Sequence, residues 1–190
     1  MPLCKGKKLA RTFFTRPTLI VAKELLGAEF NFRNCAGIIT ETEAYLGAND
    51  PASHAFRGKT QRNAGMFGPP GHAYVYFTYG KYFCLNFVTE PENCGAAVLL
   101  RSILPISGAA QMRARRQRAT QNWPAKNLTN GPAKICQACE INLAQNGLDL
   151  CAPNSVMFIR ARCSQPKFEQ TPRIGIRFGR EKLWRFVLKV

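Results

Sequence analysis

Apolar and polar residues alternate along several stretches of the chain, and a period of two predicts β-strands. The clearest stretch is AGIITETEAY at 36–45. On a strand with this period, four residues share one face: Ile39, Glu41, Glu43 and Tyr45. The run AAVLLRSILP at 96–105 is almost entirely apolar and carries one charged residue, Arg101, which is typical of a largely buried strand. We therefore expect two strands that combine core residues with isolated charges.

A β-hairpin is predicted at YVYFTYGKYF, residues 74–83. Bulky and β-branched residues alternate on both sides of Tyr79-Gly80-Lys81, and strand-like runs joined through a glycine are typical of antiparallel strands with a tight turn. In such a hairpin Tyr79 lies at the tip with a lysine beside it. Aromatic residues on strands are most often core residues, but here the turn, rather than a sheet face, holds Tyr79.

Helical signals are found in three further stretches. At 15–27, TRPTLIVAKELLG has Thr15 as an N-cap, Pro17 in the first turn and Gly27 as the stop. The other two are a basic helix, ISGAAQMRARRQRA at 106–119, and a helix that opens with Gly131-Pro132, NGPAKICQACEINL at 130–143. Residues 46–71 lack a clean periodicity and are predicted to form a loop, and short strands are expected near 156–161, 173–178 and 183–190.

These elements lack the βαβ rhythm of a parallel sheet. The expected fold class is therefore α+β: a curved, mainly antiparallel β-sheet with surrounding helices and a protruding β-hairpin. A single domain over 1–190 is expected, because 190 residues of which 46% are hydrophobic can bury a sizeable core. Residues 1–8 are expected to form a flexible basic tail. No apolar run has the length of a transmembrane helix and the start lacks a signal-peptide core, so an intracellular protein is expected.

The charge balance narrows the class of partner. Lys and Arg total 27 against 11 Asp and Glu, a formal net charge of +16, with basic runs at 113–118 and 177–185. An excess of this size favours a polyanion, and the aromatic hairpin tip makes nucleic acid a better candidate than a merely solvated basic surface. An acidic membrane surface is a weaker candidate, because no strongly amphipathic basic helix is present.

The eight cysteines raise the question of disulfides or a metal site. Without a secretory signal, disulfides are not favoured. Cys136 and Cys139 form a CxxC, followed by Cys151 and Cys163, so a zinc site in a nucleic-acid-binding protein is one alternative. The later spacings lack a second close pair, however, and cysteines three apart on an apolar helix face are more often small core residues. No metal ligand is therefore assigned.

Two neighbouring carboxylates are the main candidates for chemistry. Glu41 and Glu43 are close enough on one strand face to repel, which can raise the pKa of one carboxyl while the other stays ionised. Such a pair suits general acid/base hydrolysis through an oxocarbenium-like transition state. Solvent-facing glutamates, or partners for nearby arginines, explain the pair at least as well, and spacing does not say which glutamate would act. The only histidines, His54 and His72, lie in or next to the predicted loop and add a weak signal.

Four ordered blocks of the sequence resemble one protein family. TETEAYLG, SHAFRGKTQRN, MFGPPGHAYVYFTYGKYFCLN and AAVLLRSILP are similar to the alkyladenine, or 3-methyladenine, DNA glycosylases of the mammalian alkyladenine type, which also occur in bacteria. The likeness extends over about residues 9–150 and continues more faintly through RIGI and WRF. It implies a base-excision repair enzyme that flips a damaged purine out of duplex DNA and hydrolyses its N-glycosidic bond, leaving an abasic site.

The resemblance also implies which residues are catalytic. Glu43 matches the general base, which activates a water for attack on C1′ of the flipped nucleotide. Glu41 is then its non-catalytic neighbour. Arg101 matches the arginine that helps to hold this water, and a buried arginine beside Glu43 would also keep the carboxylate ionised.

The remaining matches imply a base pocket and a DNA surface. The pocket residues are Tyr45 and Tyr76 as aromatic walls, His54 in contact with the base, and Asn86, whose amide crowds the N2 amino group of a guanine. Tyr79 matches the tyrosine that enters the minor groove in place of the flipped nucleotide. Lys81 and the Gly131 backbone at the start of the Gly-Pro helix are expected to meet the DNA backbone.

The implied reaction is monofunctional, because no lysine stands at a matched catalytic position, and no metal or organic cofactor is implied. The implied substrates are 3-methyladenine, 7-methylguanine and hypoxanthine. The partner is double-stranded DNA with a damaged purine rather than a membrane, and a monomer is expected, in the cytoplasm or nucleoid of a bacterium or the nucleus of a eukaryote. The alternative is a non-catalytic basic nucleic-acid-binding module on the same scaffold. A glycosylase acting on RNA is disfavoured, because the A-form minor groove is wide and shallow.

Overall fold

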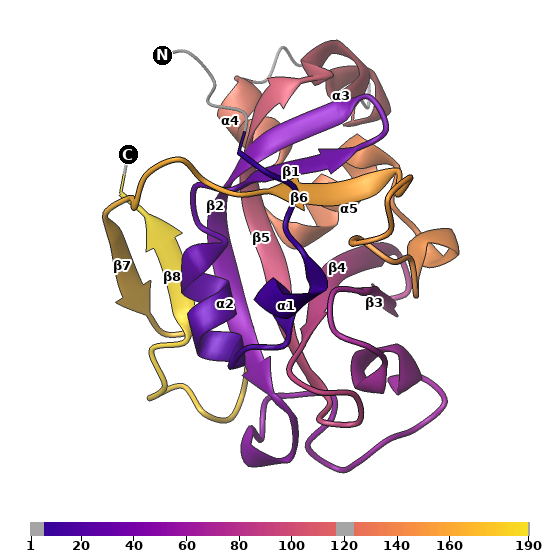
Figure 1. The fold of residues 1–190 in the computed structure, drawn as a ribbon, viewed down its shortest axis with the longest axis vertical. Helices are drawn as coiled ribbons and strands as arrows, with labels where there is room; N and C mark the ends of the chain where they lie inside the picture. Colours follow the sequence, from indigo (N-terminus) through magenta and orange to yellow (C-terminus); the bar gives the residue numbers. More distant parts are fainter. Residues whose placement is uncertain (1–5, 117–123, 190) are drawn as a thin grey trace.

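The computed structural model describes residues 6–116 and 124–189, whose strands form one curved sheet (Figure 1). The strands follow the order β3-β4-β5-β2-β1-β6, and a hairpin of β7 and β8 joins through β8 to β2. All of these pairings are antiparallel. The predicted α+β class with a mainly antiparallel sheet is therefore confirmed. The strands are β1 (Glu29–Phe32), β2 (Cys35–Leu46), β3 (Ala73–Thr78), β4 (Tyr82–Thr89), β5 (Ala96–Ser107), β6 (Met157–Arg160), β7 (Phe168–Thr171) and β8 (Arg185–Leu188).

The helices are short and several of them cover one face of the sheet (Figure 1). Side chains of α2 and α5 share a single buried core with those of β2, β4 and β5. The helices are α1 (Arg11–Phe14), α2 (Thr18–Glu24), α3 (Ala109–Arg116), α4 (Ala125–Leu128) and α5 (Pro132–Cys139), with 3-10 turns η1 (Gly47–Asn49), η2 (Ala64–Phe67) and η3 (Leu143–Gln145). In the described part of the chain, no helix is long and apolar enough to cross a bilayer. Residues 117–119 of the predicted basic helix lie outside the described residues.

A bulge near the middle of β2 changes which face of the sheet its side chains point to. The pairing of β2 with β5 shifts register between Ile39 and Glu41 and again before Thr42. An irregularity of this kind re-aims the side chains that follow it. Ile39 therefore belongs to the main core, whereas Glu41, Glu43 and Tyr45 face the other side, where Tyr45 lines a cavity. The prediction that all four share one face is wrong for Ile39, because a strict period of two ignores a bulge.

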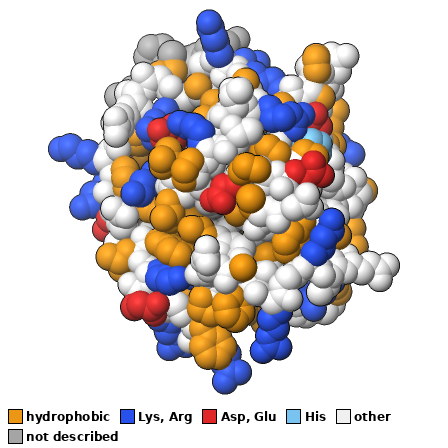
Figure 2. Space-filling view, turned by 60° about the horizontal axis from the view of Figure 1, so that its bottom comes forward, with side chains coloured by type: hydrophobic (Ala, Val, Ile, Leu, Met, Phe, Trp, Pro, Cys, Tyr) orange, Lys and Arg blue, Asp and Glu red, His pale blue; other side chains and the backbone are white. Residues whose placement is uncertain are grey.

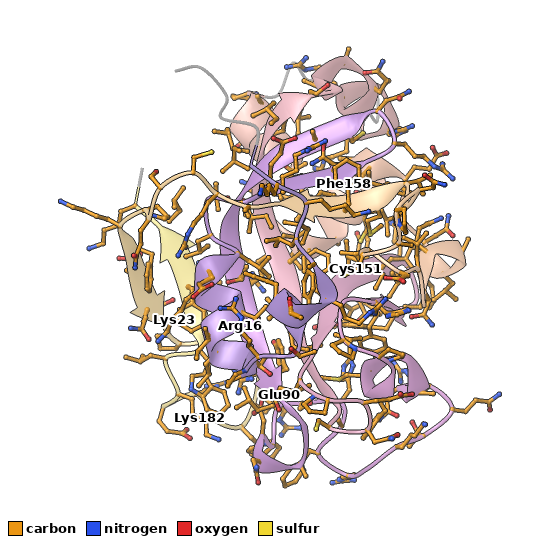
Figure 3. The ribbon with its side chains drawn as sticks, viewed as in Figure 1. Arg16, Lys23, Glu90, Cys151, Phe158 and Lys182 are labelled. Carbon is orange, nitrogen blue, oxygen red and sulfur yellow. The ribbon has the colours of Figure 1, made fainter. Side chains whose placement is uncertain are left out.

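Helix α2 begins later than predicted. Its N-cap is Pro17, and Thr15 instead ends α1, where its hydroxyl donates to the Thr12 carbonyl. The Thr18 N–H donates to the Glu90 carboxylate at 3.0 Å. Glu90, labelled in Figure 3, directly follows β4, so an acidic side chain from elsewhere in the chain takes the place of a local cap. Gly27, with φ of 81°, follows the helix as expected.

Two other predicted segments differ in the structure. The strand expected at 173–178 is absent: these residues form a loop, and the strand preceding β8 is β7, Phe168–Thr171. The expected flexible tail at 1–8 is only partly within the described residues, since 1–5 lie outside them. Lys7 accepts a backbone hydrogen bond from Ala161, and Lys8 forms a β-bridge with Arg160, so this part of the predicted tail is docked beside β6.

Of the six free cysteines among the described residues, four are buried. Cys136 and Cys139 are buried in α5 and pack in the main core. Within the described residues, no three His, Cys, Asp or Glu side chains gather as a metal ion would need. Cys163 is disulfide-bonded. The expectation of no disulfides, which was based on the lack of a secretory signal, is therefore wrong for this residue.

Candidate functional site

A cavity of about 370 Å³ lies between the β3–β4 hairpin, the end of β2 and the loop that precedes β8. This volume is within the range of about 300–1,000 Å³ that is typical of ligand pockets. The cavity is lined by Tyr45, Pro51, Ala52, His54, Met66, Tyr74, Tyr76, Thr78, Tyr79, Cys84, Asn86, Leu99, Arg101, Pro132, Ile174, Gly175, Ile176, Arg177 and Phe178. Lys and Arg side chains are spread over the face of the molecule shown in Figure 2, with hydrophobic side chains between them.

Glu43 is held directly behind the cavity wall. Its side chain is fully buried, but its carboxylate contacts three residues that line the cavity. The Tyr45 hydroxyl donates to Oε2 at 2.8 Å, and the Ile174 backbone N–H donates to Oε1 at 2.8 Å. The Arg101 guanidinium lies 3.4 Å from Oε1. The carboxylate is therefore fixed from β2, from β5 and from the loop after β7.

The environment of Glu43 acts on its protonation in two opposing ways. Burial raises the pKa of this carboxyl, and the neighbouring Glu41 carboxylate raises it further. The Arg101 charge and the hydrogen bonds from the Ile174 N–H and the Tyr45 hydroxyl lower the pKa, but burial outweighs them. Arg101 therefore favours the ionised form, as expected, while the pKa of Glu43 nevertheless stays above its ordinary value. A raised pKa is typical of a carboxylate that exchanges protons near neutral pH.

Glu41 serves a different purpose from Glu43. Its Oε1 accepts from the Arg101 Nε at 2.7 Å and from the Arg185 Nε at 2.6 Å. All three side chains are largely but not fully buried. Glu41 is thus committed to two arginines, which leaves the Arg101 Nη1 directed at Glu43. The sequence left open that the glutamates face solvent or pair with nearby arginines, and Glu41 fits the second interpretation.

Aromatic rings form part of the wall of the cavity. The His54 ring lies edge-on to the Tyr76 ring, with centroids 4.5 Å apart and an interplanar angle of 80°. Tyr76 also lies beside Tyr74, at 5.6 Å between centroids. Tyr45 lines the same cavity, so the residues expected as pocket walls are brought together. Such surfaces suit a flat, polarisable ligand.

Polar groups orient this aromatic wall. The His54 Nδ1 lies 3.1 Å from the Tyr74 hydroxyl, and the His54 carbonyl accepts from the Asn63 amide at 2.8 Å. Burial lowers the pKa of His54 and the nearby Arg62 lowers it further, so the neutral imidazole is favoured. Asn86 donates to the Tyr74 carbonyl at 3.1 Å and lines the cavity. Tyr74 and Asn63 were not singled out from the sequence, because only the tertiary contacts reveal their support of His54.

Tyr79 stands at the tip of the hairpin, as expected. Its φ is 50° and that of Gly80 is 61°, and the Lys81 N–H donates back to the Thr78 carbonyl at 3.2 Å. Positive φ at both central residues is the geometry of the tight turn that suits twisted strands. The tyrosine side chain is 85% exposed. Left-handed backbone at a bulky residue costs on the order of 1–2 kcal/mol, and here it presents an aromatic ring to solvent.

The two residues expected at a DNA backbone do not line the cavity. The Lys81 ammonium lies 5.8 Å from the centre of the Tyr82 ring, on the hairpin. Gly131 is the N-cap of α5, and the next residue, Pro132, lines the cavity. Both positions are therefore at the edge of the site rather than within it.

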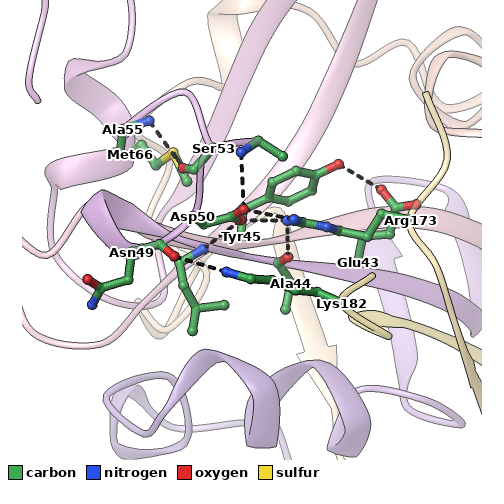
Figure 4. A network of polar contacts seen from close by, with 12 residues as sticks. Glu43, Ala44, Tyr45, Asn49, Asp50, Ser53, Ala55, Met66, Arg173 and Lys182 are labelled. Atoms are coloured by element: carbon green, nitrogen blue, oxygen red, sulfur yellow. Dashed lines mark hydrogen bonds and ion pairs between the residues drawn. The ribbon is translucent and has the colours of Figure 1, made fainter. Parts of the chain in front are cut away.

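An ion pair that was not expected lies beneath the site. Arg173 donates to both carboxylate oxygens of Asp50, and both side chains are fully buried (Figure 4). The two residues are 123 positions apart, and 173–178 was expected to be a strand, so no local pattern could have paired them. Ile174, which follows Arg173, supplies the N–H to Glu43.

Comparison with known proteins gives consistent matches over almost the whole chain. A family model described as Methylpurine-DNA glycosylase (MPG) matches residues 12–190. A protein of Ehrlichia chaffeensis is 42% identical over 180 residues, which cover 95% of this chain and 92% of that protein. One of Burkholderia lata is 45% identical over 97% of this chain and 89% of its own length, and one of Rhodopseudomonas palustris is 45% identical over 99% and 90%. All three carry the name "Putative 3-methyladenine DNA glycosylase".

Proposed function

We propose that the chain, which belongs to the methylpurine-DNA glycosylase family, excises damaged purines from double-stranded DNA by hydrolysis of the N-glycosidic bond. As a DNA glycosylase it is a hydrolase of DNA repair. The product is an abasic site, and the sugar-phosphate backbone remains intact. The single observation that carries the proposal is the buried Glu43 carboxylate, fixed by two hydrogen-bond donors and the Arg101 charge beside an aromatic-walled cavity.

Glu43 is proposed as the general base. Each carboxylate oxygen can accept more than one hydrogen bond, so a water can bind Glu43 beside the donors already present. Glu43 takes a proton from this water while the water oxygen bonds to C1′ of the nucleotide. The N-glycosidic bond breaks, and its electron pair leaves with the base. A base that is cationic in the nucleotide, such as 3-methyladenine, leaves as a neutral molecule.

Arg101 is proposed to hold the same water and to favour the ionised form of Glu43. Its Nη1 lies 3.4 Å from the carboxylate, and its Nε is occupied by Glu41, so the guanidinium has one fixed orientation. A positive charge beside Glu43 lowers the pKa that burial has raised. The carboxyl is then more readily ionised, although it is fully buried.

The substrate class is proposed from the walls of the cavity. Tyr45, His54 and Tyr76 present aromatic surfaces, and electron-poor or cationic purines stack well on such surfaces. We propose 3-methyladenine, 7-methylguanine and hypoxanthine as substrates. Asn86 is proposed to disfavour undamaged guanine, because its amide crowds the N2 amino group.

DNA is proposed to bind across the mouth of the cavity. Tyr79 is exposed and also lines the cavity, so its ring can occupy the space that a flipped nucleotide leaves in the duplex. The net charge of +16 favours the phosphate backbone, and Lys81 and Gly131 are proposed to meet it at the edge of the site. We also propose that the reaction takes place inside the cell and that the chain acts as a monomer.

The test is the release of hypoxanthine from a duplex oligonucleotide with one lesion, followed by alkali to cleave abasic sites. Glu43→Gln and Glu41→Gln form a matched pair, since they remove one charge each on the same strand. We expect Glu43→Gln to lower the single-turnover rate by roughly 10²–10⁴-fold, the range for a general base, and Glu41→Gln to lower it much less. If the wild type releases neither hypoxanthine nor methylated purines but binds the duplex, the protein is a non-catalytic binding module.

A further inference from the structure

We propose that the buried pair of Arg173 and Asp50 is a positioning device, which holds the Ile174 N–H on the Glu43 carboxylate before DNA binds. This inference rests on the proposed function for its catalytic meaning, but its structural content does not depend on activity. Neither residue lines the cavity. Both would act through their neighbours, so they are positioning residues rather than catalytic ones.

The pair holds the Arg173 guanidinium through both of its terminal nitrogens. Its Nη2 donates to Asp50 Oδ1 at 2.7 Å and its Nη1 to Oδ2 at 2.5 Å, while Nη1 also donates to the Ala44 carbonyl at 2.9 Å (Figure 4). A guanidinium bonded to both oxygens of one carboxylate has a single orientation. Ala44 lies between Glu43 and Tyr45 on β2, so Arg173 is attached to the strand that carries the base.

The same guanidinium supports Tyr45 from behind. The guanidinium carbon lies 4.6 Å from the centre of the Tyr45 ring and 5.1 Å from that of the Trp184 ring. Tyr45 donates its hydroxyl to Glu43 and lines the cavity. Arg173 therefore sets the ring of one donor to Glu43 by stacking, and sets the other donor, Ile174, through the chain.

Asp50 connects the pair to the other side of the cavity. Its Oδ1 accepts from the Ala52 N–H at 3.1 Å and its Oδ2 from the Leu46 N–H at 3.3 Å. Pro51 and Ala52 line the cavity, as does the nearby His54. The ion pair thus ties the loop after β2 to the loop after β7, and both loops reach the same cavity.

The loop after β7 is shaped so that Arg173 controls the peptide that follows it. Gly175 and Gly179 have φ of 77° and 68°, which permits a tight turn directly after Ile174. A Cβ at Gly179 would lie 3.2 Å from the Arg173 Nη2, so the turn also closes over the guanidinium. The Ile174 N–H is then directed at Glu43 by the fixed side chain before it and the turn after it.

Stability alone is a poor reason for this arrangement. A buried ion pair gains little net stability, because both charges lose their hydration, and apolar replacements are often as stable. A buried pair that adjoins the donors to a buried base is better explained by orientation. Burying the pair also keeps water from competing for the two carboxylate oxygens.

The test uses the neutral double variant Arg173→Met with Asp50→Asn, which leaves no unpaired buried charge and keeps one acceptor oxygen, enough for either the Ala52 or the Leu46 N–H group. Arg180→Lys is the matched control, since Arg180 is in the same loop and contacts only the Ile176 carbonyl among the hydrogen bonds described. Thermal unfolding identifies folded variants. Single-turnover release of hypoxanthine is then measured against pH, with duplex affinity measured on an abasic-site analogue.

We expect the double variant to keep its affinity for DNA but to lose cleavage by on the order of 10- to 100-fold, as a misplaced catalytic group does. Its acid limb should lie at higher pH, because the Ile174 N–H hydrogen bond favours the charged carboxylate. The charged and titratable groups around Glu43 that remain in place are Glu41, Tyr45, Cys84, Arg101 and Arg185. Arg173→Lys keeps the charge but cannot bond to both Asp50 oxygens at once, so its cleavage rate should lie between those of the wild type and the double variant. A folded double variant with the wild-type rate and acid limb would overturn the proposal.

A second measurement does not require the protein to be catalytically active. The Ile174 amide resonance of the free protein, followed by NMR against pH, should titrate together with Glu43 in the wild type and in Arg180→Lys. In the double variant this titration should vanish or shrink. Should the wild type show no base release, loss of the amide titration would still support the positioning role, and an unchanged titration would refute it.

Discussion

Replacement of Tyr79 by alanine separates the role of the hairpin tip in DNA from any role in folding. The side chain is 85% exposed, so its removal uncovers no core, and the change in the free energy of unfolding should stay within about 0.5 kcal/mol. In the duplex, the ring is proposed to replace the stacking of the flipped nucleotide. Stacking between a base and an aromatic side chain contributes about 1–3 kcal/mol, which corresponds to a loss of roughly 5- to 150-fold in the cleavage of paired DNA.

The assay compares single-turnover release of hypoxanthine from a paired duplex and from the same single strand. A single strand has no neighbouring pairs to separate, so Tyr79→Ala should slow the duplex reaction more than the single-strand reaction. Leu143→Ala is the control, because Leu143 is 55% exposed and does not line the cavity. An equal loss on both substrates would refute the wedge role of Tyr79.

Tyr79→Gly refines the same argument. It removes the ring as alanine does but also relieves the positive φ of 50°, a conformation that glycine adopts without strain. Tyr79→Gly should therefore cleave the duplex as slowly as Tyr79→Ala, and it should unfold at a slightly higher temperature than Tyr79→Ala. A glycine variant that is no more stable than the alanine variant would show that the strain assigned to this turn is absent.

Other consequences can be tested with the same oligonucleotides or by unfolding. Cleavage should decline on acidification through a pKa above that of an ordinary glutamate, because the base must be ionised; a pH-rate profile with an acid limb at the ordinary glutamate pKa would contradict the burial argument. The effect on stability has the opposite sign. Because the pKa of Glu43 is higher in the folded than in the unfolded state, protonated Glu43 stabilises the fold at low pH, and this stabilisation is lost as the pH rises through the folded-state pKa. Glu43→Gln, which is neutral at every pH, should therefore raise the melting temperature at neutral pH. Duplex affinity should decrease steeply with salt, given a net charge of +16, and a flat plot of log affinity against log salt would argue against phosphate contacts. Leu100→Ala, at a fully buried position of β5, should cost about 2–5 kcal/mol in urea unfolding, and a smaller loss would mean that the core relaxes around the gap.

Local patterns in the sequence predicted most of the strands that carry the site. Alternation in 36–45 and 74–83 corresponds to β2 and to the β3–β4 hairpin, and the positive φ at Gly80 explains why the runs meet there. These features depend on residues close together in the chain. The resemblance to a family then singled out Glu43 from Glu41, which spacing could not do.

Features that depend on distant residues were not predictable in this way. The Glu90 carboxylate at the start of α2 and the Asp50 partner of Arg173 are 72 and 123 residues away from the groups they bind. The bulge near Glu41 breaks a period that the sequence alone suggests is continuous. The 173–178 loop has apolar residues that resemble a strand, but Gly175 and the following Gly179 turn the chain near Glu43, and the ion pair beneath the loop holds it in place.

The edge of β2 opposite β5 has consequences for the order in which the molecule folds. Residues 35–38 of this edge pair with β1, which is adjacent in sequence, whereas Glu41–Glu43 pair with β8 and Glu43 binds Ile174, 131 residues away. Closing a long loop costs more chain entropy than closing a short one, and contacts between distant residues slow folding. The sheet can therefore form around β1, β2 and β5 while the surroundings of Glu43 are still incomplete. Partial opening would follow the same route in reverse, so the amides of β8 and of Ile174 should exchange with deuterium sooner than those of the β2–β5 ladder, and the site should be lost before the core.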